Sequence, residues 1–180
     1  MVYTMSVNKI TWCLGITLFF SSGSVMAQKI PVKWLTLQQL ATVQVSQPRK
    51  VIVEIYSEEC NWCKKFETEV LTNKVIASYI NQHYYLVKVE VSDKSTIQFN
   101  DKELKSTNGF HPLTSEYLTL PLSFPTQLFF DEHLHYLNFL KGYNTPQNFE
   151  IALAYYGDNY YKTANWADFL KSFKGKVKLP

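Results

Sequence analysis

The spacing of apolar residues predicts helices that alternate with strands. Residues 33–45 carry apolar side chains at helical spacing and precede a Ser-Gln-Pro sequence, which predicts a first helix. Residues 51–56 are mainly β-branched and aromatic, as is typical of a strand that is covered on both faces. Residues 57–81 then pass into a helical pattern that Asn73 interrupts, which predicts one kinked helix or two short ones.

The remaining residues predict three further strands and two final helices. Residues 84–91 alternate and are rich in valine, so we expect a second core strand that completes a β-α-β unit. Residues 126–130 and 134–140 are strand candidates joined by a hairpin-like connection. Helical patterns follow over residues 146–156 and 166–173.

A less regular stretch, residues 92–122, separates these groups of strands. Asp, Asn, Gly and Pro residues break its pattern, and we expect a loop, a small hairpin and then a helix over residues 117–122. The order of elements predicts an α/β fold, with a central mixed β-sheet flanked by helices. The irregular stretch then lies before the strand that follows Pro125.

The N-terminal residues have the pattern of a secretory signal peptide. Lys9 supplies positive charge, and the apolar run over residues 10–20 is too short to cross a bilayer as a mature helix. Small residues follow, and Val-Met-Ala at residues 25–27 suits signal peptidase. We therefore expect residues 1–27 to be a signal peptide, with residues 28–180 as the exported domain. The alternative, a retained membrane anchor, is disfavoured by the length of the apolar run.

The size and charge of the mature chain limit its partners. Removing 27 of 180 residues leaves 153, which is the size of one domain with one core. The formal charge of +3 falls to +2 when Lys9 leaves, and lysines cluster only at the C-terminus, where a solvated end explains them. We therefore expect no nucleic-acid partner and no membrane span in the mature chain.

The cysteines are the first sign of chemistry. Cleavage would discard Cys13 and leave Cys60 and Cys63 as the only sulfurs able to form a disulfide. A disulfide across a two-residue spacer adds little global stability, so redox chemistry explains the pair better than a structural role. A zinc or copper site would need more ligands, and the histidines offer no paired spacing beyond His133 and His135. We therefore expect no metal ion, and no cofactor other than the Cys60–Cys63 disulfide itself.

The sequence around these cysteines resembles the active site of the thioredoxin superfamily. Residues 58–64, Glu-Glu-Cys-Asn-Trp-Cys-Lys, follow a buried strand and open a helix, which is the context of a redox Cys-x-x-Cys motif. Pro125 resembles the cis-proline that precedes the third core strand in these proteins. Glu54 stands six residues before Cys60, where thioredoxins carry a buried aspartate.

The wider resemblance, over residues 35–173, is to exported thioredoxin-related proteins of the SoxW or DsbD C-terminal-domain kind. Besides the cysteine motif, the matching stretches are residues 69–70, 75–81, 123–126, 141–143 and 160–162. The resemblance implies a thioredoxin fold with an insertion before the cis-proline strand, and a bacterial periplasm or an equivalent compartment. It also implies client proteins with disulfides or thiols as partners and, for a reductase, a DsbD-type membrane electron donor.

The resemblance further implies roles for individual residues. We expect Cys60 to be the nucleophile, because backbone N–H groups at a helix N-terminus stabilise a thiolate, and Cys63 to resolve the mixed disulfide. We expect Glu54 to be buried, with a raised pKa, and to relay a proton to or from Cys63; the alternative is that it points to solvent. The expected client-binding residues are Trp62, Phe124 and Pro125.

The direction of the reaction is less well determined by the sequence. Glu58 and Glu59 beside the site favour a reductant, whereas Lys64 and Lys65 oppose that effect. We expect a reductase, with a disulfide oxidase or isomerase as the alternative. A binding module without turnover is an alternative of another class, against which the intact Cys-x-x-Cys argues. We also expect residues 92–122 to lie beside the redox site and to influence client choice.

Overall fold

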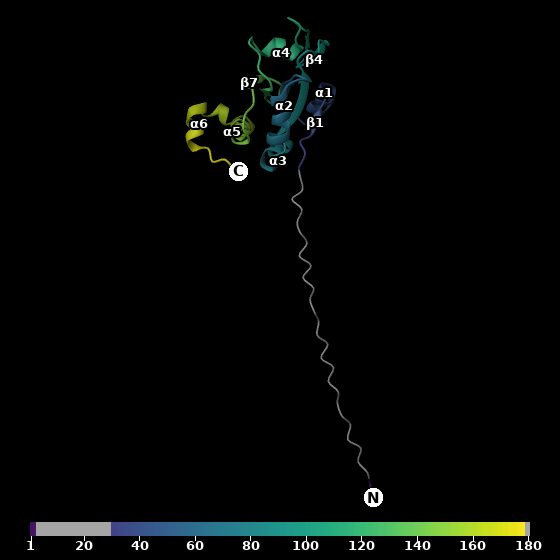
Figure 1. The fold of residues 1–180 in the computed structure, drawn as a ribbon, viewed down its shortest axis with the longest axis vertical. Coiled ribbons are helices and arrows are strands. Elements are labelled where there is room, and N and C mark those ends of the chain that lie inside the picture. The colour runs from purple at the N-terminus through teal and green to yellow at the C-terminus, as the bar shows by residue number, and fades with distance from the viewer. Residues whose placement is uncertain (3–29, 179–180) are drawn as a thin grey trace.

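A five-stranded sheet runs through the centre of the molecule, with strand order β1-β3-β2-β6-β7 (Figure 1). Its strands are β1 (Trp34–Leu35), β2 (Lys50–Tyr56), β3 (Tyr84–Glu90), β6 (Thr126–Phe130) and β7 (Tyr136–Lys141). β1 and β2 are parallel to β3, whereas β6 is antiparallel to β2 and β7, so the sheet is mixed, as expected.

The structure is a computed structural model that describes residues 1–2 and 30–178. The expected cleavage site after Ala27 lies outside these residues, as does the apolar run of the expected signal peptide. In the described part of the chain, no helix has both the length and the apolar character that a membrane span requires.

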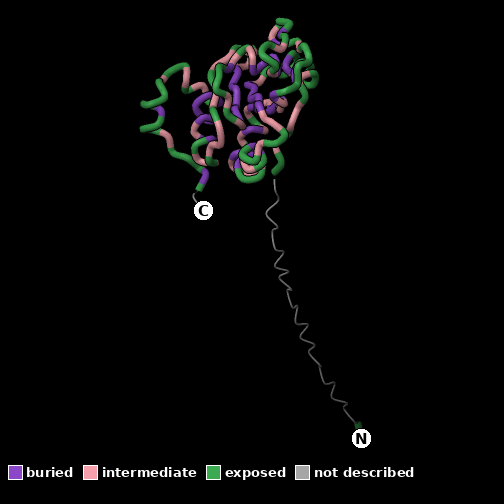
Figure 2. The backbone as a smooth tube through the Cα atoms, turned by 45° about the horizontal axis from the view of Figure 1, so that its top comes forward, coloured by how far each residue is buried: buried purple, intermediate pink, exposed green. Residues whose placement is uncertain are grey.

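One face of the sheet is covered by helices that follow β2 and β7 (Figure 1). They are α2 (Asn61–Lys65), the π-helical segment η1 (Phe66–Val70), α3 (Lys74–His83) and α5 (Pro146–Gly157). The 3-10 turn η2 (Tyr160–Lys162) and α6 (Trp166–Ser172) follow and pack against α5. Figure 2 shows the buried stretches of backbone, in purple, within the folded part of the chain. Phe66 and Phe149 meet edge to face at 5.0 Å in this core. The two predicted final helices are confirmed as α5 and α6.

The opposite face is covered by α1 (Leu37–Ser46) together with the insertion. The insertion consists of the hairpin β4 (Ile97–Phe99) and β5 (Lys102–Leu104), followed by α4 (Pro112–Tyr117). Phe99 is 4 % exposed and stacks edge to face on Phe130 of β6 at 5.1 Å. Residues 92–122 therefore contribute buried side chains to the core and pack against the sheet.

The predicted first helix begins four residues too early. Trp34 and Leu35 form β1, because they pair with Leu86 and Val87 of β3. The helix starts only after Thr36, whose side chain accepts a hydrogen bond from the backbone N–H of Gln39 in a capping box. Residues 34–35 therefore belong to a strand, although their apolar side chains were compatible with the helical spacing of the residues that follow.

The predicted helix over residues 117–122 is also misplaced. The helix of the insertion, α4, ends at Tyr117, and Leu118 is already extended. Pro121 and Pro125 disfavour a helical conformation in the residues that precede them, which explains why the apolar run continues as a non-helical segment. The Leu120–Pro121 and Phe124–Pro125 peptide bonds are both cis.

The interrupted helix after the cysteines is confirmed. The chain runs from α2 through the π-helical segment η1 into a turn, and Asn73 then caps α3 by accepting hydrogen bonds from the N–H groups of Val75 and Ile76. A second helix therefore starts where the apolar pattern breaks.

Candidate active site

Cys60 and Cys63 form a disulfide between the end of β2 and the first turn of α2. β2 ends at Tyr56, a turn is closed by the hydrogen bond from the Cys60 N–H to the Ser57 carbonyl, and Cys60 is the N-cap of α2. The Sγ atom of Cys60 accepts a hydrogen bond from the backbone N–H of Cys63 at 3.0 Å. A thiolate on Cys60 would be stabilised by the same donor.

The two sulfurs differ in their access to solvent. Cys63 belongs to α2, and it is only 2 % exposed. Cys60 is half-buried, and its neighbours Glu58, Glu59 and Asn61 are exposed. An external disulfide can therefore approach Cys60 but not Cys63. This asymmetry suits a first attack by Cys60 and a later, internal attack by Cys63.

Glu54 is fully buried, in agreement with the first of the two alternatives from the sequence. It lies in β2 on the face covered by α2 and η1, since its neighbours Val53 and Ile55 belong to the core of the opposite face. Burial raises the pKa of Glu54 to about 8, the negative charge of Glu67 adds to that rise, and Lys88 lowers it. Neither carboxyl oxygen has a hydrogen-bond partner within residues 30–178.

Two residues that the sequence did not single out act on Glu54. Lys88 is its register partner on β3, and Glu67 follows Cys63 by four residues, in η1, which continues directly from α2. The Lys88 ammonium group forms an ion pair with Glu67 and lies 4.0 Å from the centre of the Tyr56 ring. A lysine among the valines of a core strand was the available sequence signal for this cluster.

The register of the sheet places Pro125 near the cysteine turn. Thr126 pairs with Ile55, so Pro125 lies beside the end of β2 that leads to Cys60. Pro125 is buried, and Phe124 is half-buried and packs against the core on the α4 side of the sheet. The structure thus brings Pro125 to the site, while much of Phe124 is engaged in packing.

Trp62 is 56 % exposed and forms a surface cluster beside the disulfide. Its ring lies 5.5 Å from that of Tyr143, in the segment after β7, and the Lys65 ammonium group is within 5.3 Å of both rings. The Tyr143 hydroxyl donates a hydrogen bond to Glu69 at 2.9 Å. The contact between Tyr143 and Trp62 could not be inferred from the sequence, because the two residues are 81 positions apart.

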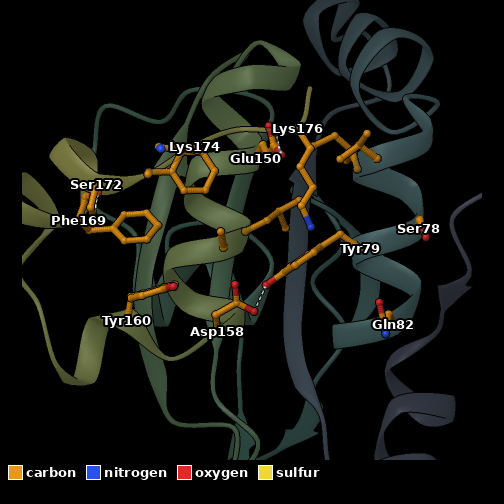
Figure 3. Close-up of a pocket in the computed structure, with 15 residues that line it drawn as sticks. Ser78, Tyr79, Gln82, Glu150, Asp158, Tyr160, Phe169, Ser172, Lys174 and Lys176 are labelled. Carbon is orange, nitrogen blue, oxygen red and sulfur yellow. Dashed lines mark hydrogen bonds between the residues drawn. The ribbon is translucent and has the colours of Figure 1, made fainter. Parts of the chain in front are cut away.

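A cavity of about 460 Å³ lies elsewhere, between α3, α5, α6 and the C-terminal segment (Figure 3). Figure 3 shows Tyr79 and Asp158 reaching toward each other across it, joined by a hydrogen bond of 2.7 Å. None of the six expected site residues lines it. In the described part of the chain, no three His, Cys, Asp or Glu side chains are placed to hold a metal ion.

Comparisons with known proteins agree with this geometry. The family described as Thioredoxin-like domain matches residues 37–157. A thioredoxin-fold protein from Helicobacter pylori superposes with a TM-score of 0.57 at 23 % identity, covering 69 % of this chain and 79 % of that one. A thioredoxin from Thermus thermophilus gives 0.52 at 18 % identity, covering 68 % and 84 %. The sequence comparison with curated proteins returns no match.

At these identities the structural similarity establishes a shared fold, and the family match covers the cysteine motif, Glu54 and Pro125 together. A Cys-x-x-Cys disulfide in this fold indicates thiol–disulfide exchange chemistry. The chain therefore belongs to the thioredoxin-like domain family.

Proposed function

We propose that this protein is an exported thiol:disulfide oxidoreductase that reduces protein disulfides with the dithiol form of Cys60 and Cys63. The observation that carries the proposal is the unequal access to the two sulfurs: half-buried Cys60 caps a helix, and Cys63 is enclosed next to it. A purely structural disulfide has no need of one accessible sulfur.

The reaction follows from that arrangement in two displacements. The Cys60 thiolate attacks one sulfur of the client disulfide, and the other client sulfur leaves as a thiolate and takes up a proton. Cys63 then loses its proton and attacks Cys60 Sγ, which forms the Cys60–Cys63 disulfide and releases the second client thiol. Two electrons pass from the protein dithiol to the client, and the reverse sequence oxidises a client dithiol.

Glu54 is the group we assign to the proton of Cys63. A carboxyl group with a pKa of about 8 is close in proton affinity to a thiol, so a proton can pass between them with little change in free energy. The Glu54 carboxylate accepts the proton when Cys63 attacks, and the neutral carboxyl returns it when the disulfide is reduced again.

The client is expected to lie across Trp62 and the Phe124–Pro125 segment. Trp62 offers an exposed aromatic surface, and Pro125 directly precedes β6, next to the end of β2 that leads to the cysteines. The Ser123 carbonyl accepts a hydrogen bond from the Thr126 hydroxyl, whereas the peptide groups of Phe124 precede the first ladder residue and are the backbone groups that we expect an extended client segment to pair with.

The reduction potential of the pair tests the direction of the reaction. Equilibration of the mature protein with glutathione should give a value near or below about −270 mV, as for thioredoxin. A reductase in an oxidising compartment also needs a source of electrons, for which we propose a DsbD-type membrane donor. A value near about −120 mV would instead make the protein an oxidase and overturn the proposed direction.

Turnover separates an enzyme from a binding module. The mature protein should accelerate the reduction of insulin by dithiothreitol, and replacing Cys60 with serine should abolish that acceleration. Absence of any acceleration by the unmodified protein would favour a module that binds clients without turnover.

Export is tested separately, by sequencing the N-terminus of protein recovered from the periplasm. We expect the sequence to begin at Gln28, whereas an intact Met1 would contradict cleavage.

A further inference from the structure

Four buried polar atoms without partners occur on neighbouring strands, β2 and β6. Glu54 and Gln127 are direct register partners in this antiparallel pair. Side chains in that relation point to the same face, with Cβ atoms about 4.5–5.5 Å apart. Both residues are 0 % exposed, and neither the carboxyl oxygens of Glu54 nor the amide oxygen and nitrogen of Gln127 have a partner in residues 30–178.

The other polar neighbours of Glu54 are charged side chains, unlike the neutral carboxamide of Gln127. Glu67 of η1 and Lys88 of β3 are the charged groups that act on it, and they are engaged in an ion pair with each other. On the β6 side the row across the sheet continues from Gln127 to Leu140 of β7, which carries no charge. Gln127 is therefore the neutral donor and acceptor on that side of Glu54.

A carboxamide can serve both states of a carboxyl group. Its N–H₂ group donates to the carboxylate, and after rotation its carbonyl oxygen accepts from the O–H of the neutral acid. A buried glutamine that made no such bond would leave its polar group unpaired, which is unfavourable. The same contact would satisfy Glu54, whose oxygens are equally without partners.

We propose that Gln127 is a positioning residue for Glu54, holding its carboxyl group by hydrogen bond before and after that group takes the proton of Cys63. The inference rests on the proposed role of Glu54 in the oxidoreductase reaction. Gln127 touches neither client nor sulfur in this scheme; it acts only through Glu54, by setting the pH at which Glu54 can accept the proton.

The test replaces the carboxamide without changing the length of the side chain. In Gln127→Met, the titration of Glu54 is followed by carbon NMR in ¹³C-glutamate-labelled protein, in the disulfide form, where the cysteines do not titrate. Glu54→Gln assigns the signal. The hydrogen bond that the carboxylate loses is charge-assisted and stronger than the one that the neutral acid loses, so the midpoint should rise by about one pH unit. The pH profile of insulin reduction should shift in the same direction.

A second buried glutamine provides the matched control. Gln44 of α1 donates to the carbonyl oxygens of Arg49 and Glu132 at 2.7 and 2.8 Å, on the other side of the molecule. Gln44→Met should lower the melting temperature without moving the Glu54 titration. Gln127→Met should move it even if the two variants lose similar stability.

An unchanged midpoint in Gln127→Met would overturn the proposal, whatever happens to stability. Should that variant fail to fold, Gln127→Leu, which also removes the carboxamide, takes its place with the same readout and the same deciding outcome. The NMR titration does not depend on turnover. If the unmodified protein fails to reduce insulin, the proposed function is wrong. The NMR titration still shows whether Gln127 affects the pKa of Glu54.

Discussion

A carboxyl group in the interior of the sheet makes the stability of this protein depend on pH. The pKa of Glu54 rises from 4.5 to about 8 on folding, so between these values the folded chain keeps a proton that the unfolded chain releases. The free energy of unfolding therefore falls as the pH rises from about 4.5 to about 8, and this contribution is constant outside that window. Glu54 stabilises the fold least under the conditions where it can accept a proton.

Glu54→Gln should remove this dependence. Over the window, Glu54 should contribute a loss of stability with a slope that approaches about 1.4 kcal/mol per pH unit, and the variant should lack that contribution. Urea unfolding at several pH values measures it. Glu116→Gln, at an exposed position of α4, is the control and should leave the slope in place. A slope that persists in Glu54→Gln would show that another group is responsible.

The unequal exposure of the cysteines makes opposite predictions for their serine variants. Cys63→Ser should accumulate a mixed disulfide between Cys60 and a client, since Cys60 remains accessible and the internal attack is lost. Non-reducing electrophoresis and mass spectrometry of captured adducts measure this. Cys60→Ser should capture nothing, and equal capture by both variants would contradict the assignment of the nucleophile.

At the scale of elements, the hairpin of the insertion should contribute to global stability. Phe99 of β4 is 4 % exposed and contacts Phe130 of the central sheet, so Phe99→Ala should lower the free energy of unfolding by about 3 kcal/mol. Gln98→Ala, at the exposed position beside it, should change that value by less than about 0.5 kcal/mol. Urea denaturation of both variants tests this, and a small loss in Phe99→Ala would mean that the hairpin opens independently of the sheet.

Elements with strong local patterns were predictable, whereas those set by distant contacts were not. Residues 51–56 of β2 form an apolar run that only Glu54 interrupts, and β2 is joined to its parallel neighbour β3 by one helical region. β1 has only two residues and exists because of its pairing with residues 86–87, about fifty positions later. No local pattern distinguishes such a strand from the start of a helix.

The same division applies to the site. The cysteines, Glu54 and Pro125 could be predicted because fixed spacings or their place beside a strand mark them. Lys88 offered one signal, as a lysine among the valines of a core strand. Its position next to Glu54 depends on strand pairing between distant residues, as does that of Gln127, and the contact of Tyr143 with Trp62 likewise joins residues far apart in the sequence.

At the scale of the whole molecule, the core extends beyond the segment that the family match covers. That match ends at residue 157, yet Phe169 of α6 and Val177 of the C-terminal segment are buried in the same core as Phe149. Glu150 of α5 holds this segment by accepting hydrogen bonds from the backbone N–H groups of Lys176 and Val177 at 2.6 and 2.9 Å.

Glu150→Ala should release the C-terminal segment. Both N–H groups lose a charged acceptor, so the free energy of unfolding should fall by about 1–2 kcal/mol, and hydrogen exchange at Lys176 and Val177 should accelerate. Gln147→Ala removes a weaker contact, from the Gln147 amide to the Lys178 carbonyl, and should have a smaller effect. Unaltered exchange at Val177 would show that packing alone holds the segment.

Trp62 sits between the two cysteines in the sequence, with its indole ring largely in solvent and against Tyr143. A disulfide next to an excited indole accepts an electron from it and quenches its emission, whereas two thiols quench much less. The intensity of the intrinsic tryptophan fluorescence should therefore depend on the oxidation state of the pair and should increase when Cys60 and Cys63 are reduced. Trp62→Phe should remove that signal, so each turnover could be followed by light emission without any added label.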